Sequence, residues 1–138
     1  MKVLKGYIFS RKLLNGDYVT QKTQNLVIRE SCKLKNFQLE LSSAEYIMEN
    51  SYLVLNNLIK NLKNYDGVAF FSLFQLPALE NKRSEFYNTF LKKRKLMYFC
   101  NEKIILSSFK GVINVENIIN ISKILHLSPN KKDLENIL

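Results

Sequence analysis

The sequence predicts one α/β domain: a three-layer sandwich in which a mostly parallel sheet of about four to five strands carries helices on both faces. Short apolar runs rich in aromatic and β-branched residues alternate with stretches whose apolar residues recur every three or four positions. The connections are short, with no internal repeat and no inter-domain linker. The length of 138 residues fits one ordinary domain. We expect that domain at residues 1–127, with 128–138 as a short C-terminal helix or tail.

The first half of the chain contains two predicted strands, each followed by a predicted helix. Residues 5–10 (KGYIFS) are a short aromatic and β-branched run, and residues 37–41 (FQLEL) place apolar side chains at every second position, as strands do. Thr20 is a helix-capping residue, and the helix that it opens runs to about residue 35. Residues 51–64 form the clearest helix, because their apolar residues recur at helical spacing opposite an asparagine- and lysine-rich face.

The second half continues the alternation. Residues 68–73 (VAFFSL) are apolar nearly throughout, which is typical of a central parallel strand buried on both faces. Pro77 ends that segment. The remaining predicted elements are helices over 82–94 and 115–125, strands over 96–100 and 104–106, and a short helix from Ser128 and Pro129 to Leu138.

The chain carries a formal net charge of +9 and has a pI of about 9.6. One explanation of this charge is an anionic partner, either a nucleic acid or an anionic membrane. Coding bias is the other explanation, because 17 of the 21 basic residues are lysine, asparagine is abundant, and the lysines are spread along the chain with their densest groups at 92–95 and 131–132. Both explanations stay open. In a lysine-rich chain the rare arginines Arg11 and Arg29 are candidates for gripping phosphate or carboxylate, with surface ion pairs as the alternative.

The sequence lacks the marks of several protein classes. No apolar run reaches the roughly 20 residues that span a bilayer, and the N-terminus lacks the apolar core of a signal peptide. We therefore expect a cytoplasmic protein that does not insert into membranes, with Cys32 and Cys100 as reduced core residues. There is no Walker loop, no glycine-rich dinucleotide motif and no carboxylate-rich metal run, so we expect no cofactor and no metal.

Polar residues follow the predicted strands. In parallel α/β sheets, ligands bind beyond the carboxyl ends of the strands. Those ends are residues 10–11, 43–46 and 72–77. Glu45 is a candidate general acid or base, and Ser10 is a candidate nucleophile only if a base lies nearby. The single histidine, His126, lies far along the chain, so a Ser-His-Asp triad is not expected.

The first predicted helix carries a stripe of polar residues in addition to those at the strand ends. Gln21, Asn25 and Arg29 are spaced by four on the first predicted helix, where they can hydrogen-bond a sugar or an anion, or form a solvated face. Ser72 needs a hydrogen-bond partner within its apolar run, and Gln75 beyond it offers a donor and an acceptor. We expect these side chains to meet in one cleft with Arg11 and Glu45. For Glu45 a structural ion pair or a helix-entry carboxylate is the alternative.

Four segments of the chain are similar to segments of a known family. They are GYIFSR at 6–11, TQKTQNLVIRESC at 20–32, LSSAEYIM at 41–48 and VAFFSLFQLP at 68–77. Together they resemble the sporadic carbohydrate cluster proteins, small bacterial proteins encoded among genes for surface-polysaccharide and lipopolysaccharide biosynthesis. The resemblance implies a cytoplasmic protein of that pathway that binds or modifies a sugar, a nucleotide sugar or a small anionic precursor. It also adds Gln24, Ser43, Tyr46 and Pro77 to the positions of interest. The expected catalytic residues are then Ser10, Glu45 and Tyr46, and the expected substrate-binding residues are Arg11, Gln21, Gln24, Asn25, Arg29, Ser43, Ser72 and Gln75.

A weaker likeness is to the catalytic domain of serine recombinases, the resolvases. That domain also opens with a Gly-Tyr strand leading to a serine, carries a glutamine on its first helix, and has a hydrophobic strand after a leucine-rich helix. The likeness implies a resolvase- or flavodoxin-like fold. Recombinases place an Asp-Arg pair and a further Arg just after that hydrophobic strand, whereas this chain has the uncharged residues 74–77 there (FQLP) and no arginine between Tyr7 and Ser10. The likeness therefore implies the fold without DNA cleavage.

Two alternatives to the carbohydrate enzyme stay open. One is a non-catalytic dimeric binding or scaffold module of the same pathway. The other is a resolvase-like nucleic-acid-associated domain that lacks recombinase activity. On the main interpretation the expected partners are a sugar or sugar-phosphate ligand and a second copy of the chain in a homodimer, and nucleic acid is not expected.

Overall fold

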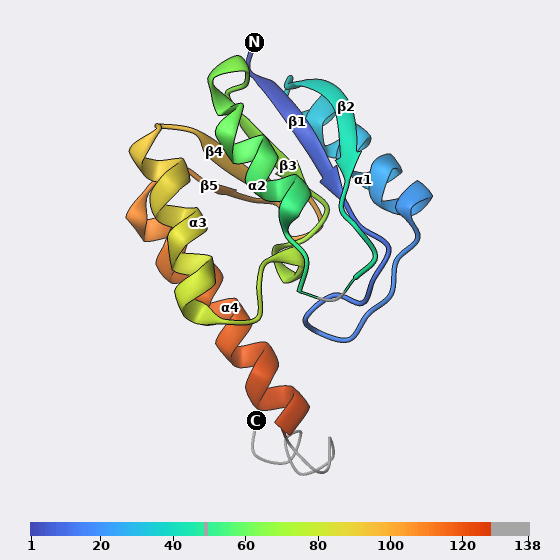
Figure 1. The fold of residues 1–138 in the computed structure, drawn as a ribbon, viewed down its shortest axis with the longest axis vertical. Helices are drawn as coiled ribbons and strands as arrows, with labels where there is room; N and C mark the ends of the chain where they lie inside the picture. The colour runs from blue at the N-terminus through green and yellow to red at the C-terminus, as the bar shows by residue number, and fades with distance from the viewer. Residues whose placement is uncertain (49, 128–138) are drawn as a thin grey trace.

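The computed structural model describes residues 1–48 and 50–127, without the side chains of the last two (Figure 1). The strands are β1 (Val3–Ile8), β2 (Gln38–Ala44), β3 (Gly67–Phe70), β4 (Leu96–Phe99) and β5 (Ile104–Leu106). The helices are α1 (Gln21–Leu34), α2 (Leu53–Lys60), α3 (Glu80–Lys92) and α4 (Phe109–Leu127), with short 3-10 turns η1 (Leu62–Asn64) and η2 (Leu73–Gln75). None of the helices in these ranges is long and apolar enough to cross a membrane.

The strands form one sheet in the order β2-β1-β3-β4-β5. β2, β1, β3 and β4 are parallel, and β5 pairs antiparallel with β4. The predicted fold class is confirmed: a mostly parallel five-stranded sheet with helices on both faces. The carboxyl ends of β1 to β4 therefore lie at one edge of the sheet, and their amino ends lie at the opposite edge.

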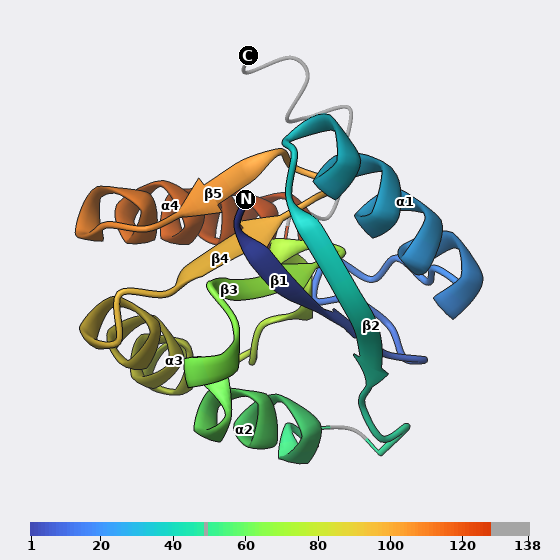
Figure 2. The ribbon, with the colours of Figure 1, turned by 90° about the horizontal axis from the view of Figure 1, so that it is seen from above.

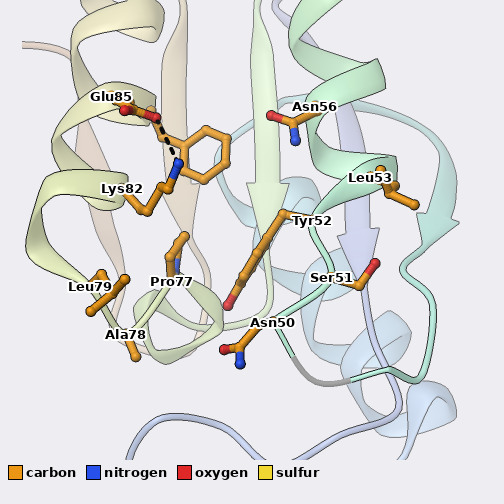
Figure 3. A pocket seen from close by; sticks show the side chains of 11 residues that line it. Asn50, Ser51, Tyr52, Leu53, Asn56, Pro77, Ala78, Leu79, Lys82 and Glu85 are labelled. Atoms are coloured by element: carbon orange, nitrogen blue, oxygen red, sulfur yellow. Dashed lines mark ion pairs between the residues drawn. The ribbon is translucent and has the colours of Figure 1, made fainter.

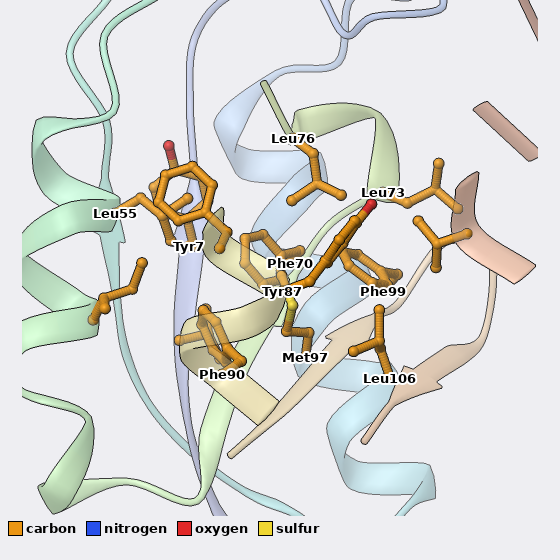
Figure 4. Packing of buried hydrophobic residues seen from close by; sticks show 14 of the residues in the cluster. Tyr7, Leu55, Phe70, Leu73, Leu76, Tyr87, Phe90, Met97, Phe99 and Leu106 are labelled. Carbon is orange, nitrogen blue, oxygen red and sulfur yellow. The ribbon is translucent and has the colours of Figure 1, made fainter. Parts of the chain in front are cut away.

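Two cores lie on the two faces of the sheet. α1 covers one face, and α2, α3 and α4 pack on the other (Figure 2). The central strand β3 is buried on both sides, because Val68 and Phe70 join the core under α2 and α3 while Ala69 joins the core under α1. The larger core contains a group of aromatic rings among its aliphatic residues (Figure 4): the centre of the Phe70 ring lies 5.5 Å from that of Tyr7 and 5.2 Å from that of Phe99.

The predicted elements match those of the structure, with differences at their ends. The Thr20 cap is confirmed, because its side-chain oxygen accepts a hydrogen bond from the backbone N–H of Thr23 at 3.3 Å. β2 continues through Ser42 and Ser43, which we expected outside the strand. α2 is shorter than predicted, and α4 begins at Phe109, six residues earlier than predicted. The helix expected from Ser128 lies outside the described residues.

Candidate functional site

Four of the eleven predicted site residues lie at the carboxyl edge of the sheet in two separate hydrogen-bonded groups: Gln24, Glu45, Ser72 and Gln75. The first group joins the ends of β1, β3 and β4 through Gln24, Ser72, Gln75 and Glu102. The second joins the ends of β1 and β2 to the start of α2 through Tyr7 and Glu45. In each group the polar side chains form hydrogen bonds to other groups of the protein.

Gln24 is the centre of the first group. It is fully buried on α1, and its amide nitrogen donates to the carbonyl oxygens of Phe9 and Val19, both at 2.8 Å. Its amide oxygen accepts from the backbone N–H of Phe9 at 3.1 Å and from Nε2 of Gln75 at 3.2 Å. All four hydrogen-bonding positions of the amide are filled, so Gln24 fixes the end of β1 and has no capacity left for a ligand.

Ser72 and Gln75 close the end of β3 around the short turn η2. Oε1 of Gln75 accepts from the backbone N–H of Ser72, and Oγ of Ser72 accepts from the backbone N–H of Phe74, which together make a capping box. The hydroxyl of Ser72 donates to Oε2 of Glu102 at 2.7 Å, and Oε1 of Glu102 accepts from the backbone N–H of Leu73 at 2.8 Å. The partner that the buried hydroxyl of Ser72 required is therefore Glu102, a residue in the β4–β5 turn that the sequence did not single out.

Glu45 is buried and caps α2. Its carboxyl oxygens accept from the backbone N–H groups of Val54 at 3.0 Å and Leu55 at 3.1 Å, where the helix dipole favours negative charge. The phenol of Tyr7 donates to Oε2 of Glu45 at 2.8 Å. Burial, the charge of Glu45 and this hydrogen bond raise the pKa of Tyr7 far above its usual range, so the phenol stays protonated and keeps donating. Glu45 therefore has the geometry of a carboxylate at the entry of a helix, which was the alternative to a general acid or base.

Arg11 is held in place beside the second group. Its Nη1 donates to the carbonyl oxygen of Met48 at 2.7 Å, and more weakly to that of Tyr46 at 3.4 Å. The guanidinium lies between two aromatic rings, 4.6 Å from the centre of Phe9 and 4.7 Å from that of Tyr52. The side chain thus fastens the loop after β2 to the end of β1.

The remaining predicted site residues do not converge with these groups. Gln21 and Asn25 are partly exposed on α1, Arg29 is exposed farther along the same helix, and the side chain of Tyr46 is exposed after β2. Ser43 lies within β2 on the edge of the sheet. Ser10 has no hydrogen-bond partner among the described residues, so no base is shown to activate its hydroxyl.

A hollow of about 500 Å³ lies between α2 and α3 (Figure 3). Its walls include Tyr52, Asn56, Leu79 and the exposed ion pair of Lys82 with Glu85. Of the expected positions only Pro77 lines it. Within the described ranges, no three or more His, Cys, Asp or Glu residues are grouped so as to hold a metal ion.

An ion pair that the sequence did not indicate joins buried Arg83 of α3 to partly buried Glu116 of α4. Arg83 is 1% exposed, and its guanidinium donates two parallel bonds to the carboxylate of Glu116, at 2.8 and 2.9 Å. Tyr87 donates to the same carboxylate, and Nη1 of Arg83 donates to the carbonyl oxygens of Pro77 and Ala78. Burial opposes ionisation of Glu116, but the hydrogen bonds from Arg83 and Tyr87 and the charge of Arg83 outweigh it and lower the pKa of Glu116.

No protein-family model matches the sequence, and no curated protein matches it either. Solved structures do match. The N-terminal catalytic domain of TP901-1 integrase superposes with a TM-score of 0.63 over 88% of this chain and 96% of that domain, at 17% identity. The chain has the fold of a recombinase catalytic domain. A resolvase family site-specific recombinase from Streptococcus pneumoniae also matches, with a TM-score of 0.59 over 87% of this chain and 88% of that one, at 10% identity.

These matches correct the main interpretation of the sequence. The fold-level likeness to serine recombinases is confirmed, whereas the likeness to sporadic carbohydrate cluster proteins has no support. The expected role in surface-carbohydrate biosynthesis is wrong, because the matches over nearly the whole chain are to recombinase domains. The expected sugar or sugar-phosphate ligand and the expected exclusion of nucleic acid are wrong for the same reason.

Proposed function

We propose that this protein associates with nucleic acid through a recombinase-type catalytic fold and does not cleave DNA. The observation that carries the proposal is the match to two recombinase domains over nearly their whole length. The net charge of +9 supports the same partner. The identity of 10–17% leaves the catalytic residues free to differ, so the chemistry must be argued from this chain's own side chains.

The side chains at the carboxyl edge argue against DNA cleavage. Cleaving a phosphodiester requires cationic groups or hydrogen-bond donors aimed at the phosphate oxygens as charge develops on them. Residues 74–77 (FQLP) carry no charge, and the amide of Gln75 is bonded to Gln24 and Ser72. Arg11, the neighbour of Ser10 in sequence, is held by backbone carbonyls and two aromatic rings. Gln75 and Arg11 are thus oriented by the fold, and residues 74–77 bring no cation to this edge, although the buried Nη2 of Arg11 has no hydrogen-bond partner among the described residues.

Two measurements on the wild-type protein test the proposal. We expect a fluorescent DNA duplex of about 20 base pairs to bind at about 50 mM salt, with an affinity that falls steeply by about 200 mM salt as counterions are released. We expect supercoiled plasmid to stay intact under the same conditions, with no covalent protein–DNA adduct on a denaturing gel.

Ser10→Ala is the control for the absence of chemistry. Because no hydrogen bond joins Ser10 to a base among the described residues, we expect this variant to match the wild type in DNA binding and in plasmid integrity. Absence of duplex binding at low salt would overturn the nucleic-acid assignment. Nicked plasmid that disappears with Ser10→Ala would overturn the claim that the protein does not cleave DNA.

A further inference from the structure

Several connections of the chain form one continuous surface at the amino ends of the parallel strands. Three connections lie there: those from α1 to β2, from α2 to β3 and from α3 to β4. The start of β1 lies there too, and so does the start of α4, because β5 is antiparallel. Figure 1 shows the N-terminus and the connection from α2 to β3 at the top of the view. We call this surface the amino edge. It comprises residues 1–2, 31–37, 57–66, 89–95 and 107–110, which are the last helical turns, the connections, and the residues that flank β1 and β5.

The amino edge accounts for the whole net charge of the protein. It holds ten of the 21 Lys and Arg residues and one of the 12 Asp and Glu residues, Asp66. The rest of the chain carries eleven of each sign and is formally neutral, so the excess of +9 belongs to this surface. Coding bias toward lysine does not explain why the carboxylates are sorted away from it. The ten cations are Lys2, Lys33, Lys35, Lys60, Lys63, Lys92, Lys93, Arg94, Lys95 and Lys110.

These cations are exposed and lie in a row across the sheet. All are exposed except Lys95, which is half-buried, and neither ion pair of the described residues includes any of them. The strand order places the groups from Lys33 beside β2, through Lys63 beside β3 and Lys92 beside β4, to Lys110 after β5. Five strands at a spacing of about 4.8 Å extend over roughly 19 Å, a length in which one DNA strand presents about five phosphates at about 3.4 Å each.

Helix dipoles explain only part of this pattern. Cations are favoured in the last turn of a helix, which accounts for Lys33, Lys60 and Lys92. Lys110 lies in the first turn of α4, where the dipole disfavours a cation, and Lys2 adjoins no helix. A requirement beyond helix stability is therefore needed for these positions.

We propose that the amino edge binds the phosphate backbone of duplex nucleic acid, at the end of the sheet opposite to the carboxyl edge. This inference rests on the proposed association with nucleic acid and names the surface that performs it. Nine of the ten cations are lysines, which meet phosphates as point charges, whereas bidentate reading of guanine is typically done by arginine. Binding is therefore independent of base sequence.

Two triple variants that remove the same charge separate this surface from charge in general. The edge variant is Lys63→Gln, Lys92→Gln and Arg94→Asn. The control variant is Lys12→Gln, Lys22→Gln and Lys103→Asn, all exposed residues outside the amino edge. The sets match in kind: each has one helical lysine, one lysine outside the α-helices, and one residue with a left-handed backbone (φ of 57° at Arg94 and 58° at Lys103), a conformation that asparagine tolerates.

Duplex binding is measured for each protein over a range of salt concentrations, after equal melting temperatures have shown that all are folded. We expect the edge variant to bind at least about tenfold more weakly near 0.1 M salt, with the slope of log affinity against log salt reduced by about two to three. The control variant is expected to stay within about twofold of the wild type, and a scrambled duplex to bind as well as any other.

Three outcomes would overturn the inference. Equal loss in both variants would show that net charge alone binds the duplex, and the proposed function would survive without this surface. A strong preference among duplexes of different sequence would contradict backbone recognition. Binding to anionic lipid vesicles without binding to duplex or single-stranded DNA would overturn both this inference and the proposed function.

Discussion

Arg83→Ala is expected to lower the free energy of unfolding by about 3–5 kcal/mol, the usual cost of removing one partner of a buried ion pair. Arg83 is 1% exposed and joins α3 both to Glu116 of α4 and to the carbonyl oxygens of Pro77 and Ala78. Truncation removes both Arg83 bonds from the Glu116 carboxylate, which keeps the hydrogen bond from Tyr87, and it takes the Arg83 donor from both carbonyls. Urea unfolding monitored by circular dichroism measures the loss.

Arg29→Ala is the matched control, because Arg29 is an exposed arginine on a helix. We expect it to change stability by less than about 0.5 kcal/mol. Arg83→Lys is expected to fall between the two, because lysine keeps the charge and loses the two parallel bonds. Equal stability of Arg83→Ala and Arg29→Ala would contradict the structural role of the ion pair.

Glu116 gives the same ion pair a pH dependence. Its pKa is lowered in the folded state, so its ionisation stabilises the protein above the unfolded pKa of glutamate, and that stabilisation is lost as the pH falls through the folded pKa. The stability difference between the wild type and Glu116→Gln should therefore be largest near neutral pH and shrink in acid. A difference that grows as the pH falls would contradict this assignment.

Gln24→Ala is expected to lower the free energy of unfolding by about 3 kcal/mol or more, because buried groups that lose their partners cost about 1–3 kcal/mol each. The variant leaves the N–H and C=O of Phe9 and the amide nitrogen of Gln75 without the partner that Gln24 supplied. Gln21→Ala is the control, since Gln21 is the same residue type on the same helix and is only partly buried. Unfolding of both variants at the same urea concentration would contradict the claim that the hydrogen bonds of Gln24 fix the end of β1.

The sequence was sufficient to predict the fold. Its signals were local: the alternation in residues 37–41, the apolar run at 68–73 and the cap at Thr20 each report on the backbone within a few residues. The parallel arrangement then follows from the alternation of strands and helices. The predicted ends of β2 and α4 were less accurate. β2 continues beyond residue 41 because Ser43 and Ala44 pair with Tyr7 and Ile8 of β1, and the sequence does not show this pairing.

The polar residues were harder to interpret, because the sequence does not show which partner a side chain meets. Glu45 could be a base or a helix cap, and only the position of α2 decides between them. The partner of Ser72 is Glu102, 30 residues later, in a turn with no distinguishing pattern. Convergence at one edge of a sheet was predicted, but whether those groups bind a ligand or each other depends on distances that no spacing rule supplies.

Two buried residues did leave a signal. Gln24 lies four and eight residues before Ile28 and Cys32, so it belongs to the apolar face of α1 and not to the polar stripe. Arg83 lies seven residues before Phe90, on the inward face of α3, in a chain where arginine is rare. A polar residue on an apolar face predicts a satisfied structural group, and this rule would have found both. The sorting of charge could not be found in this way, because it depends on which connections the fold brings together.

Hydrogen exchange on the wild-type protein, with and without a DNA duplex, tests most directly the claim that nucleic acid meets the amino edge while the carboxyl edge is closed. We expect the duplex to slow exchange of backbone amides in the connections at residues 31–37, 57–66 and 89–95, and to leave residues 9–20 and 71–79 unchanged. Slower exchange confined to residues 9–20 and 71–79 would place the nucleic acid at the carboxyl edge and contradict the account.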